Sequence, residues 1–426
     1  MKKLALVGII LPIMLSVHAQ NDFDVLQASR SGYGGTARFQ SMGGAFGSLG
    51  GDFSSISVNP AGLGVYRSAE LSITPSLYYN NTEANYMGSA TSDFVYNFNV
   101  NNVGYVGHVD LGKSGWVSFN FGLGFNRQSN YYQNQFISTN NAAGSLLEEF
   151  TLNAEGDIGN YYYEGMALST GALFYKEIAT GEIVQTMDVT DDEIQDLPVY
   201  EDFRYSNDFY HYANLYNDGQ LIFGQPLDQD NRSKGKRSEF VISAAGNYNH
   251  KVYVGASIGI QRLRYENEFD HYETTHGSTF AQSYPTDVYF DNFDFSTTTN
   301  TYGTGFNFKA GVIARPVDFL RVGASIHTPT IFNLESEFYS QMTTELTNGD
   351  LFEDRTELLI SEFKAITPLK ASAGIAFQAN DIGLISFDYE FIDYSNMKFR
   401  LEDDRAYERA VNDDIRSNYK STHNFR

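Results

Sequence analysis

Residues 116–126 read WVSFNFGLGFN, and apolar side chains occupy every second position of this stretch. The odd positions from Val117 to Phe125 carry valine, phenylalanine or leucine, whereas the even positions carry serine, asparagine or glycine. Because successive side chains of a β-strand point to opposite faces, this alternation predicts a strand with one apolar and one polar face. The same alternation recurs in residues 251–261, 302–314 and 317–327.

Glycine is frequent on the polar face of these strands, together with serine, asparagine and an occasional charge. This combination favours a transmembrane antiparallel β-barrel that has lipid outside and water inside. A soluble β-sandwich is the alternative fold, because it gives the same alternation with the apolar face turned inward. The sandwich, however, has shorter strands with a turn about every 8–12 residues, and it would not place so many glycines on its polar face.

Nine long strands are predicted in this way. They cover residues 70–80, 93–109, 115–127, 238–249, 251–267, 301–315, 317–341, 354–378 and 382–394. If Pro329 and Pro368 mark breaks, the same residues form eleven shorter strands, because proline cannot donate to a strand ladder. A change of phase near Asn101 and Asn102 predicts a β-bulge.

A further strand begins at residues 421–425, just before the chain ends at Arg426. Nine strands and a started tenth leave two open edges, whereas barrels in lipid close because unpaired backbone groups are costly there. We therefore expect that about five strands are missing from the C-terminus. We also expect the sheet to be open and curved.

The connections between the predicted strands are alternately tight and long. This is the pattern of periplasmic turns and external loops in outer-membrane barrels. The longest connection, residues 128–237, is expected to be an external loop. Residues 1–19 are expected to be a secretory signal, since Lys2 and Lys3 precede an apolar run that ends in small residues at Ala19.

The composition excludes several classes of function. The 426-residue chain has a formal charge of −23 and no cysteine. The negative charge repels phosphate backbones and argues against nucleic-acid binding. The lack of cysteine excludes disulfides, iron–sulfur clusters, thiolate zinc sites and cysteine nucleophiles.

Residues 32–64 differ from the rest of the chain, because they contain ten glycines with small residues between them. This segment is too apolar for a solvated linker and is expected to fold only against a surrounding wall. Asp52 is expected to cap a short turn over residues 54–58, and Pro60 to end that turn because it lacks an N–H. Gly62 and Gly64 are expected to form a hinge.

These residues carry a family resemblance. The sequences RFQSMGGAF at 38–46 and DFSSISVNPAGL at 52–63 resemble the N-terminal hatch of the FadL/TodX family of outer-membrane channels. Three later segments, RVGASIHTP at 321–329, TPLKASAG at 367–374 and SFDYEFIDYS at 386–395, resemble middle strands of the same family in the same order.

The resemblance implies a fourteen-stranded barrel with the hatch inside it, which carries long-chain fatty acids or aromatic hydrocarbons. The implied domains are a signal peptide at 1–19, a hatch at 20–69 and an incomplete barrel at 70–426. In this family external loops capture the ligand, and a hatch rearrangement releases it sideways through a gap in the wall near the third strand. The implied gating residues are Asp52, Asn59, Pro60, Ala61 and Gly62.

We find no residue pattern for catalysis or for a cofactor. The Gly-x-Ser-x-Gly signature does not occur with strand-to-helix alternation. His271 and His276 have the wrong spacing for one helical face, so neither a metal nor haem is expected. The acidic runs that contain Asp191 and Glu402 are read as solvated loops, with loose Ca²⁺ binding between lipopolysaccharide phosphates as the alternative.

Charged residues near the polar face of the strands are the remaining candidates, because a charge inside a barrel must be solvated or paired. Arg262, Lys309, Arg321 and Lys370 are candidate contacts for a ligand carboxylate. The basic run of Arg232, Lys234, Lys236 and Arg237 is interpreted as a basic loop end. A site for lipopolysaccharide phosphate or for a substrate carboxylate is the alternative.

The sequence therefore predicts a passive, monomeric outer-membrane channel for hydrophobic molecules, surrounded by outer-membrane lipids and lipopolysaccharide. The alternative is a barrel that does not transport and serves as a scaffold in protein secretion or surface attachment. The lumen distinguishes the two functions. A continuous apolar pocket behind the hatch favours transport, whereas a filled lumen and an apolar external rim favour the scaffold.

Overall fold

The computed structural model describes most of the chain. The described residues are 21–30, 32, 34–142, 144–147, 149–150, 161–177, 183–184, 207–211, 216–217, 220–221, 226–274, 290–379 and 383–426. The predicted signal peptide, the acidic run around Asp191 and His276 lie outside these residues.

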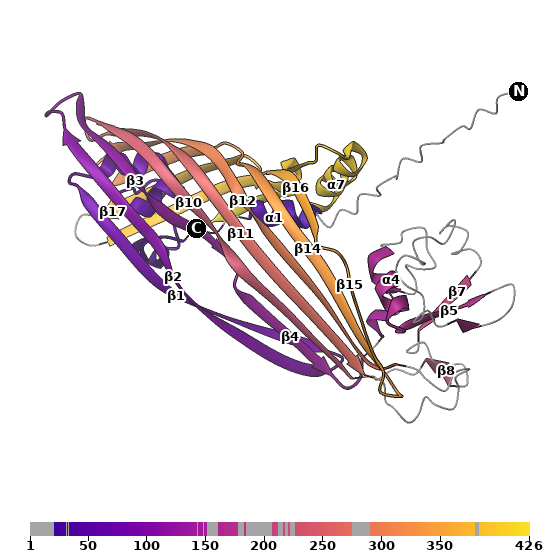
Figure 1. Cartoon of the computed structure of the whole chain (residues 1–426). Helices are drawn as coiled ribbons and strands as arrows, with labels where there is room; N and C mark the ends of the chain where they lie inside the picture. Colours follow the sequence, from indigo (N-terminus) through magenta and orange to yellow (C-terminus); the bar gives the residue numbers. More distant parts are fainter. Residues whose placement is uncertain are drawn as a thin grey trace, which may run out of the picture.

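Within the described residues, one antiparallel sheet of fifteen strands dominates the molecule (Figure 1). Its strands are β1 (Glu70–Tyr86), β2 (Ser89–Asp110), β3 (Trp116–Asn130), β4 (Gln133–Thr139), β10 (Leu227–Tyr248), β11 (Val252–Thr274), β12 (Phe290–Val317), β13 (Leu320–His327), β14 (Ile331–Leu346), β15 (Leu351–Arg355), β16 (Leu359–Ile366), β17 (Lys370–Ala379), β18 (Gly383–Asp393), β19 (Lys398–Arg400) and β20 (Ser421–Phe425). Short strands form two small separate sheets, β6-β5-β7 (Ile183–Val184, Leu173–Glu177, Asn207–His211) and β8-β9 (Tyr216–Asn217, Gln220–Leu221).

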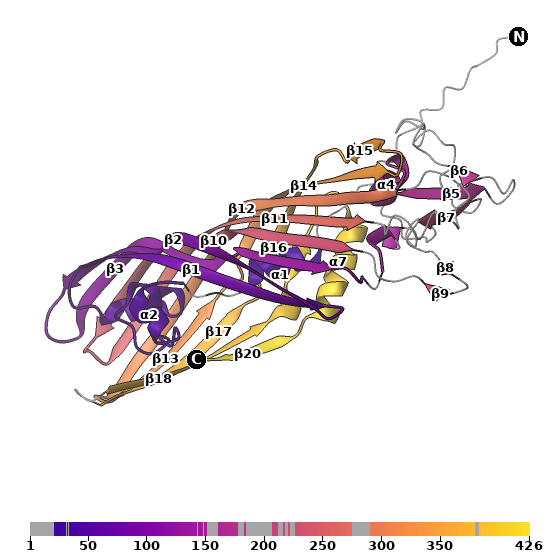
Figure 2. The ribbon, with the colours of Figure 1, turned by 90° about the horizontal axis from the view of Figure 1, so that it is seen from below.

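The sheet curves around a small group of helical segments and is open (Figure 2). Its hydrogen-bonded order is β1-β2-β3-β10-β11-β12-β13-β17-β18-β20, with β1 and β20 at the two edges of the described sheet. The expected open, curved antiparallel sheet is therefore confirmed, and the strand expected at residues 421–425 is β20. The fourteen-strand total and the missing C-terminal strands stay predictions.

The helical segments are few and short. They are α1 (Asp22–Ser29), α2 (Ala37–Ser41), α4 (Tyr161–Ser169), α7 (Arg405–Asn418) and three 3-10 turns, η1 (Phe53–Ser57), η2 (Pro60–Val65) and η4 (Tyr394–Asn396). None of the helices in the described part of the chain is long and apolar enough to cross a membrane.

The two prolines break the strands, as the alternative of shorter strands predicts, but a further break between β15 and β16 was not predicted. Residues 317–341 form β13 and β14, and residues 354–378 form β15, β16 and β17. Threonine hydroxyls maintain the ladder at these breaks. Thr328 Oγ1 accepts from Phe308 N at 3.0 Å, and Thr367 Oγ1 accepts from Thr330 N at 2.8 Å. The predicted bulge is also present, because Thr74 pairs with Asn102 and Pro75 with Val100, which leaves Asn101 as the extra residue.

Several strands are longer than predicted, mainly at one end of the sheet. β10 begins at Leu227 rather than at residue 238, and β11 continues to Thr274. The expected external loop 128–237 therefore contributes its first and last residues to β3, β4 and β10, and the basic run of residues 232–237 lies within β10. These strand ends were missed because they carry polar residues on both faces, so the alternation disappears.

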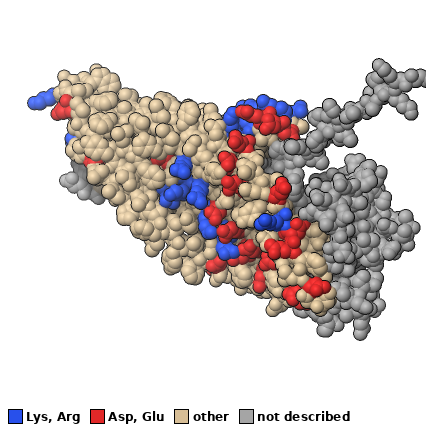
Figure 3. Space-filling view, viewed as in Figure 1, with Lys and Arg blue, Asp and Glu red and all other residues tan. Residues whose placement is uncertain are grey.

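The short turns after β2, β10 and β12 lie at the other end of the sheet, which we call the turn end (Figure 1). The opposite end of the sheet is called the loop end. Between them lies a broad surface band without charges, bordered by charged side chains toward the loop end (Figure 3). The apolar side chains of this band point outward. Phe119, Phe121, Ile258 and Phe306 are 44%, 38%, 50% and 63% exposed, respectively. A soluble sandwich buries such a face, so the exposed apolar band excludes that alternative.

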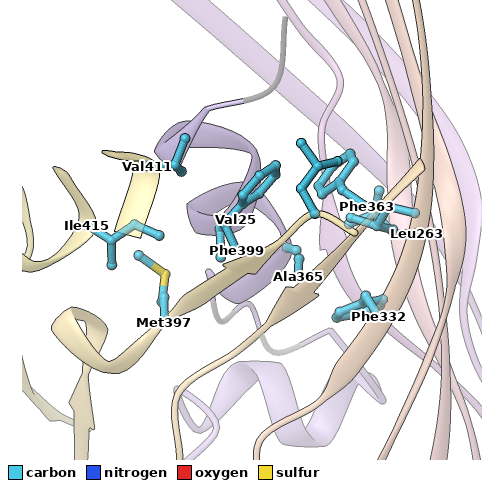
Figure 4. Packing of buried hydrophobic residues seen from close by; sticks show 12 residues of the cluster. Val25, Leu263, Phe332, Phe363, Ala365, Met397, Phe399, Val411 and Ile415 are labelled. Atoms are coloured by element: carbon cyan, nitrogen blue, oxygen red, sulfur yellow. The ribbon is translucent and has the colours of Figure 1, made fainter. Parts of the chain in front are cut away.

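The glycine-rich segment packs against the opposite, concave face. Residues 34–66, which we call the hatch, contain α2, η1 and η2 and lie near the turn end (Figure 2). Toward the loop end, α1 and α7 pack on inward side chains of the wall (Figure 4). Val25 of α1 and Val411 and Ile415 of α7 belong to one buried cluster with Leu263 and Phe363 of the wall. The concave side of the described sheet is thus filled from both ends.

We predict that a charge in the middle of the apolar band destabilises the protein far more than one at the loop end. Ile258→Arg should lower the free energy of unfolding by about 2–4 kcal/mol, because the guanidinium would enter the hydrocarbon. Tyr272→Arg, on the same face of β11 but near the loop end, should cost less than about 1 kcal/mol. Urea unfolding in phosphatidylcholine vesicles, followed by the fluorescence of the single Trp116, measures both. Equal costs at the two positions would contradict a lipid-facing band.

Candidate functional site

The hatch is built from two capped 3-10 turns. Asp52 caps η1, since its Oδ1 accepts from Ser54 N at 2.9 Å, as predicted. Asn59 caps η2, and its Oδ1 accepts from Ala61 N at 3.0 Å. Pro60 does more than end the first turn, because it occupies the first position of the second turn, where its missing N–H has no cost.

The predicted hinge at Gly62 and Gly64 stays a prediction. Both glycines lie inside η2 at negative φ and are buried. A β-carbon on Gly62 would lie 2.5 Å from Ser55 Oγ and 3.0 Å from Gly50 Cα. This glycine therefore allows two hatch segments to pack closely.

Asn59 also fastens the hatch to the wall. Its Nδ2 lies 2.7 Å from the carbonyl oxygen of Gly47, 3.2 Å from that of Val312 and 3.3 Å from that of Ala324. Val312 and Ala324 are paired residues of β12 and β13. One fully buried amide thus closes the second hatch turn with its oxygen and contacts two wall strands with its nitrogen.

The hatch can pack closely on the wall because the wall residues under its large side chains are glycines. The fully buried ring of Phe53 packs over Gly104 of β2 and Gly124 of β3, where an added β-carbon would lie 2.4 Å from ring atoms. On β12, a β-carbon at Gly311 would lie 2.0 Å from Asn59 Oδ1. The glycines of the polar strand faces therefore provide room for a second layer of backbone.

Further hydrogen bonds join the hatch to β13 and β18. Arg321 Nη1 donates to Leu49 O at 2.6 Å, and Ser325 Oγ donates to Val58 O at 2.7 Å. Gly47 N donates to Asp388 Oδ2 at 2.6 Å. Arg321, a candidate for a ligand carboxylate, is thus used to hold a hatch carbonyl.

A buried ion pair lies beside the hatch on the concave face. Lys309 Nζ on β12 is 2.6 Å from Glu239 Oε2 on β10, and the two side chains are 4% and 0% exposed. Gln128 and Gln261 donate to the same carboxylate at 3.2 Å and 3.4 Å. The pair is therefore embedded in a hydrogen-bonded network, which a buried charge requires.

The structure separates the four candidate carboxylate contacts. Lys309 and Lys370 line one small cavity of about 20 Å³ on the concave face. Arg321 holds the hatch near the turn end. Arg262 lies on the outward face of β11, in the same alternating set as Ile258 and Ile260, so its expected place near the polar face is wrong.

A lateral cleft interrupts the wall between β2 and β3. Their ladder runs from Asp110 paired with Ser118 to Asn102 paired with Asn126 and stops there. In the described part of the chain, residues 89–100 of β2 pair only with β1. The cleft has a volume of about 540 Å³ and is lined by Asn97, Phe98, Asn99, Val100, Phe125, Arg127, Tyr132, Lys234, Gly235, Lys236, Arg264 and Glu266.

The hatch contacts the wall at the point where this ladder stops. Asn126 Nδ2 donates to Ser57 Oγ of the hatch at 2.9 Å. Asn102 Nδ2 donates to Asn126 Oδ1 at 2.7 Å, and Ser72 Oγ of β1 donates to Asn102 Oδ1 at 2.8 Å. A continuous chain of hydrogen bonds thus runs from the hatch through the last pair of the ladder to β1.

A second large cavity lies on the concave side, next to α1. Its volume is about 530 Å³, and amide, hydroxyl and aromatic side chains line it, among them Phe23, Tyr131 and Tyr265. The C-terminal end of α1 is held at its edge. Arg237 donates to the carbonyl oxygens of Ala28 and Arg30, and Tyr131 Oη donates to Gln27 O at 3.1 Å. This arrangement complements the negative end of the helix.

The sequence did not single out Ser57, Asn102, Asn126 and Glu239 as site residues. The asparagines belong to the polar strand faces, so an amide among glycines was the signal that could have found them. No group of three or more metal-ligating side chains occurs within the described ranges. His271 forms a buried contact of 2.8 Å with Glu273, and Glu402 contacts Lys364 at 2.7 Å.

Comparisons with known proteins give structural neighbours only. No protein-family profile and no curated protein sequence matches the chain. The chain is similar to the Pseudomonas putida toluene transporter TodX, at 12% identity and a TM-score of 0.42 over 88% of this chain and 74% of that one. It is also similar to the CymD monoaromatic hydrocarbon channel, at 13% identity and a TM-score of 0.42 over 86% and 72% of the two chains. A TodX variant, deltaS2S3, gives 12% identity and a TM-score of 0.43 over 87% and 74%. At these values the similarity carries no functional argument.

We predict that Gly311→Ala detaches the hatch while the sheet stays folded. The new methyl group would occupy the position of Asn59 Oδ1, and overpacking of this kind costs about 1–3 kcal/mol. Hydrogen exchange measured by mass spectrometry should then rise in residues 52–66 and not in β10 or β11. Gly383→Ala is the matched control, because nothing lies within 4 Å of its added β-carbon. Unchanged protection of the hatch in Gly311→Ala would contradict the close packing described here.

We predict that Lys309→Met destabilises the protein by about 3–5 kcal/mol, because it leaves the Glu239 carboxylate buried without its cation. The double variant Glu239→Gln/Lys309→Met should recover most of this loss, since no uncompensated charge remains. Unfolding in vesicles by urea gives both values. If the double variant were as unstable as Lys309→Met, the network would be needed for its shape rather than for its charge balance.

Proposed function

We propose that this chain is an outer-membrane channel for the uptake of hydrophobic molecules. In this proposal the hatch blocks the route along the sheet axis, and the lateral cleft lets the ligand leave sideways. The proposal depends on one observation. The ladder between β2 and β3 stops at the residue pair that is hydrogen-bonded to Ser57 of the hatch.

The wall supports a lateral route. Strands that face lipid normally pair along their whole length, because water is absent to replace a lost backbone hydrogen bond. A segment of β2 that pairs on one edge only is therefore a costly feature of a wall in lipid. Phe98, Val100 and Phe125 offer an apolar lining to a molecule that passes through the cleft.

The same geometry gives the hatch residues their roles in the proposal. Asp52 and Asn59 hold the two turns that present Ser57 to Asn126. Pro60, Ala61 and Gly62 form the turn that packs on β10 and β11. A shift of these turns would break the contact between Ser57 and Asn126 and would loosen the last pair of the ladder.

The charges favour a neutral ligand. Lys309 is paired with Glu239, Arg237 holds α1 and Arg321 holds the hatch. A fatty-acid carboxylate would have to displace one of these partners to be bound on the concave face, whereas a hydrocarbon would not. The proposed ligand class is therefore small hydrophobic molecules. In this proposal a long-chain fatty acid binds on the concave face only if its carboxylate displaces one of these partners.

A scaffold without transport is the second candidate, and one observation favours it. The inward apolar side chains at the loop end are covered by α1 and α7 rather than lining an empty pocket (Figure 4). A hydrophobic ligand has to displace these helices before it can use that surface.

A crosslink between the hatch and the wall distinguishes the two functions. The chain has no cysteine, so Ser57→Cys/Asn126→Cys introduces one defined pair. Joining the pair with a short bis-alkylating reagent should lower the uptake of toluene and of oleate into proteoliposomes at least tenfold, because the hatch can no longer leave the ladder. Thr301→Cys/Ser336→Cys is the control. These hydroxyls lie 3.1 Å apart on the neighbouring strands β12 and β14, so their crosslink should leave uptake unchanged. Equal uptake by all crosslinked forms, or no uptake by any form, would favour the scaffold.

A further inference from the structure

Basic side chains gather on the outward surface beside the lateral cleft, between the uncharged band and the acidic region at the loop end (Figure 3). The exposed ones are Lys236 on β10 and Arg262 and Arg264 on β11, and the buried Arg127 on β3 lies beside them in the cleft. The protein as a whole carries a charge of −23, so this surface differs in sign from the rest.

In the register of β10 with β11, the basic residues nearer the loop end face acidic residues, whereas Lys236 does not. Nearer the loop end, Arg232 lies opposite Glu268 and Lys234 opposite Glu266. Ion pairs form there, such as Lys234 with Glu268 at 3.2 Å. The next outward-facing pair is Lys236 opposite Arg264, and like charges directly opposite each other destabilise a sheet.

Within the described residues, these cations have few acidic partners. No ion pair involves Lys236, Arg262 or Arg127, and Arg264 reaches only Glu266, at 3.9 Å. Arg127 is the clearest case, because it is only 6% exposed and lines the cleft. Its Nε is buried without a hydrogen-bond partner. The Arg127 guanidinium is thus incompletely hydrogen-bonded by the protein, and it lies in the cleft together with Lys236 and Arg264.

The residues next to this cationic surface, on the side of the turn end, are apolar and exposed, which indicates that the ligand also has an apolar part. The pair that follows Ser238 and Arg262 is Phe240 opposite Ile260, which are 45% and 48% exposed. In the cleft, Phe98 and Val100 lie beside Arg127 and Lys236. Cationic groups thus lie one or two strand steps, roughly 7–14 Å, from a lipid-facing apolar surface.

We propose that this cationic surface binds the phosphate-bearing headgroup of a lipid in the outer leaflet, with its acyl chains along Phe240, Ile260 and Phe98. Phosphate oxygens accept from the guanidinium of Arg127 and from Lys236 and Arg264, and they relieve the repulsion between the two opposed cations. The inference rests on the outer-membrane placement of the proposed function and is independent of any transport step.

Binding is tested with the full chain in detergent, using bisphosphorylated lipid A as the probe and native mass spectrometry as the readout. Lys236→Gln/Arg264→Gln removes two exposed charges and should weaken binding about 10- to 30-fold. Lys113→Gln/Lys251→Gln is the matched control, because it removes two exposed charges at the turn end and should leave the affinity unchanged. Equal losses in both variants, or no loss in the first, would overturn the proposal.

Further probes separate the sources of the anion. Dephosphorylated lipid A should bind at least tenfold more weakly, and millimolar inorganic phosphate should not displace lipid A. If inorganic phosphate alone displaced lipid A, the surface would be a site for small anions and not for a lipid. If oleate binding rather than lipid A binding fell in the variants, the charges would serve the transported ligand. Either result overturns the lipid assignment.

The stability of the protein in vesicles with and without lipid A is a second test. If these cations had only a structural role, added lipid A would not change the order of stability of the variants. In vesicles of phosphatidylcholine alone, Lys236→Gln/Arg264→Gln should unfold at a higher urea concentration than the wild type, because the like-charge contact is gone. After lipid A is added, the order should reverse, since only the wild type gains from binding. Arg127→Lys should retain most of the lipid A affinity and Arg127→Gln should not. The same order of stability in both vesicles would contradict the proposal.

Discussion

The need to pair every backbone N–H and C=O of a lipid-facing strand governs this structure. Where proline interrupts β13–β14 and β16–β17, the hydroxyls of Thr328 and Thr367 accept the amides that the ladder would otherwise leave free. The strands are thereby kept together across two breaks. Against this background, the place where the ladder between β2 and β3 stops is a distinctive feature of the wall. Nearer the loop end, Thr91 Oγ1 of β2 donates to Phe136 O of β4, so a hydroxyl joins the strands again beyond the cleft.

The second layer of the molecule follows from side-chain size. The outward faces carry bulky apolar residues, so the concave face is where small residues can collect. Glycines there let Phe53 and Asn59 approach the wall backbone, and Asn59 hydrogen-bonds directly to wall carbonyls. The hatch is thus fastened through main-chain contacts that depend on the absence of β-carbons. Its last contact, from Ser57 to Asn126, lies beside the lateral cleft.

Charge is distributed according to the same two faces. On the concave face, cations are engaged by the protein itself, as in the pair of Lys309 with Glu239 and the contact of Arg321 with Leu49 O. On the outward face, ion pairs lie at the loop end. Next to the apolar band, the basic residues Lys236, Arg262 and Arg264 have no acidic residue opposite them on the paired strand. The inner charges hold the protein together, whereas the outer row faces the surroundings of the protein.

The sequence by itself determined the features that depend on near neighbours. Alternation gave the strands, their faces and the bulge at Asn101, and the side chains of Asp52 and Asn59 cap turns that begin one residue later. The strand ends could not be read from the sequence, because the residues beyond the apolar band are polar on both faces and no longer alternate. The helix α7 was not predicted either. Only the tertiary structure decided that Glu239 meets Lys309, that Arg262 points outward beside Arg264, and that β2 leaves β3 at Asn102. These features depend on which distant strands pair and where that pairing stops, and no local pattern carries that information.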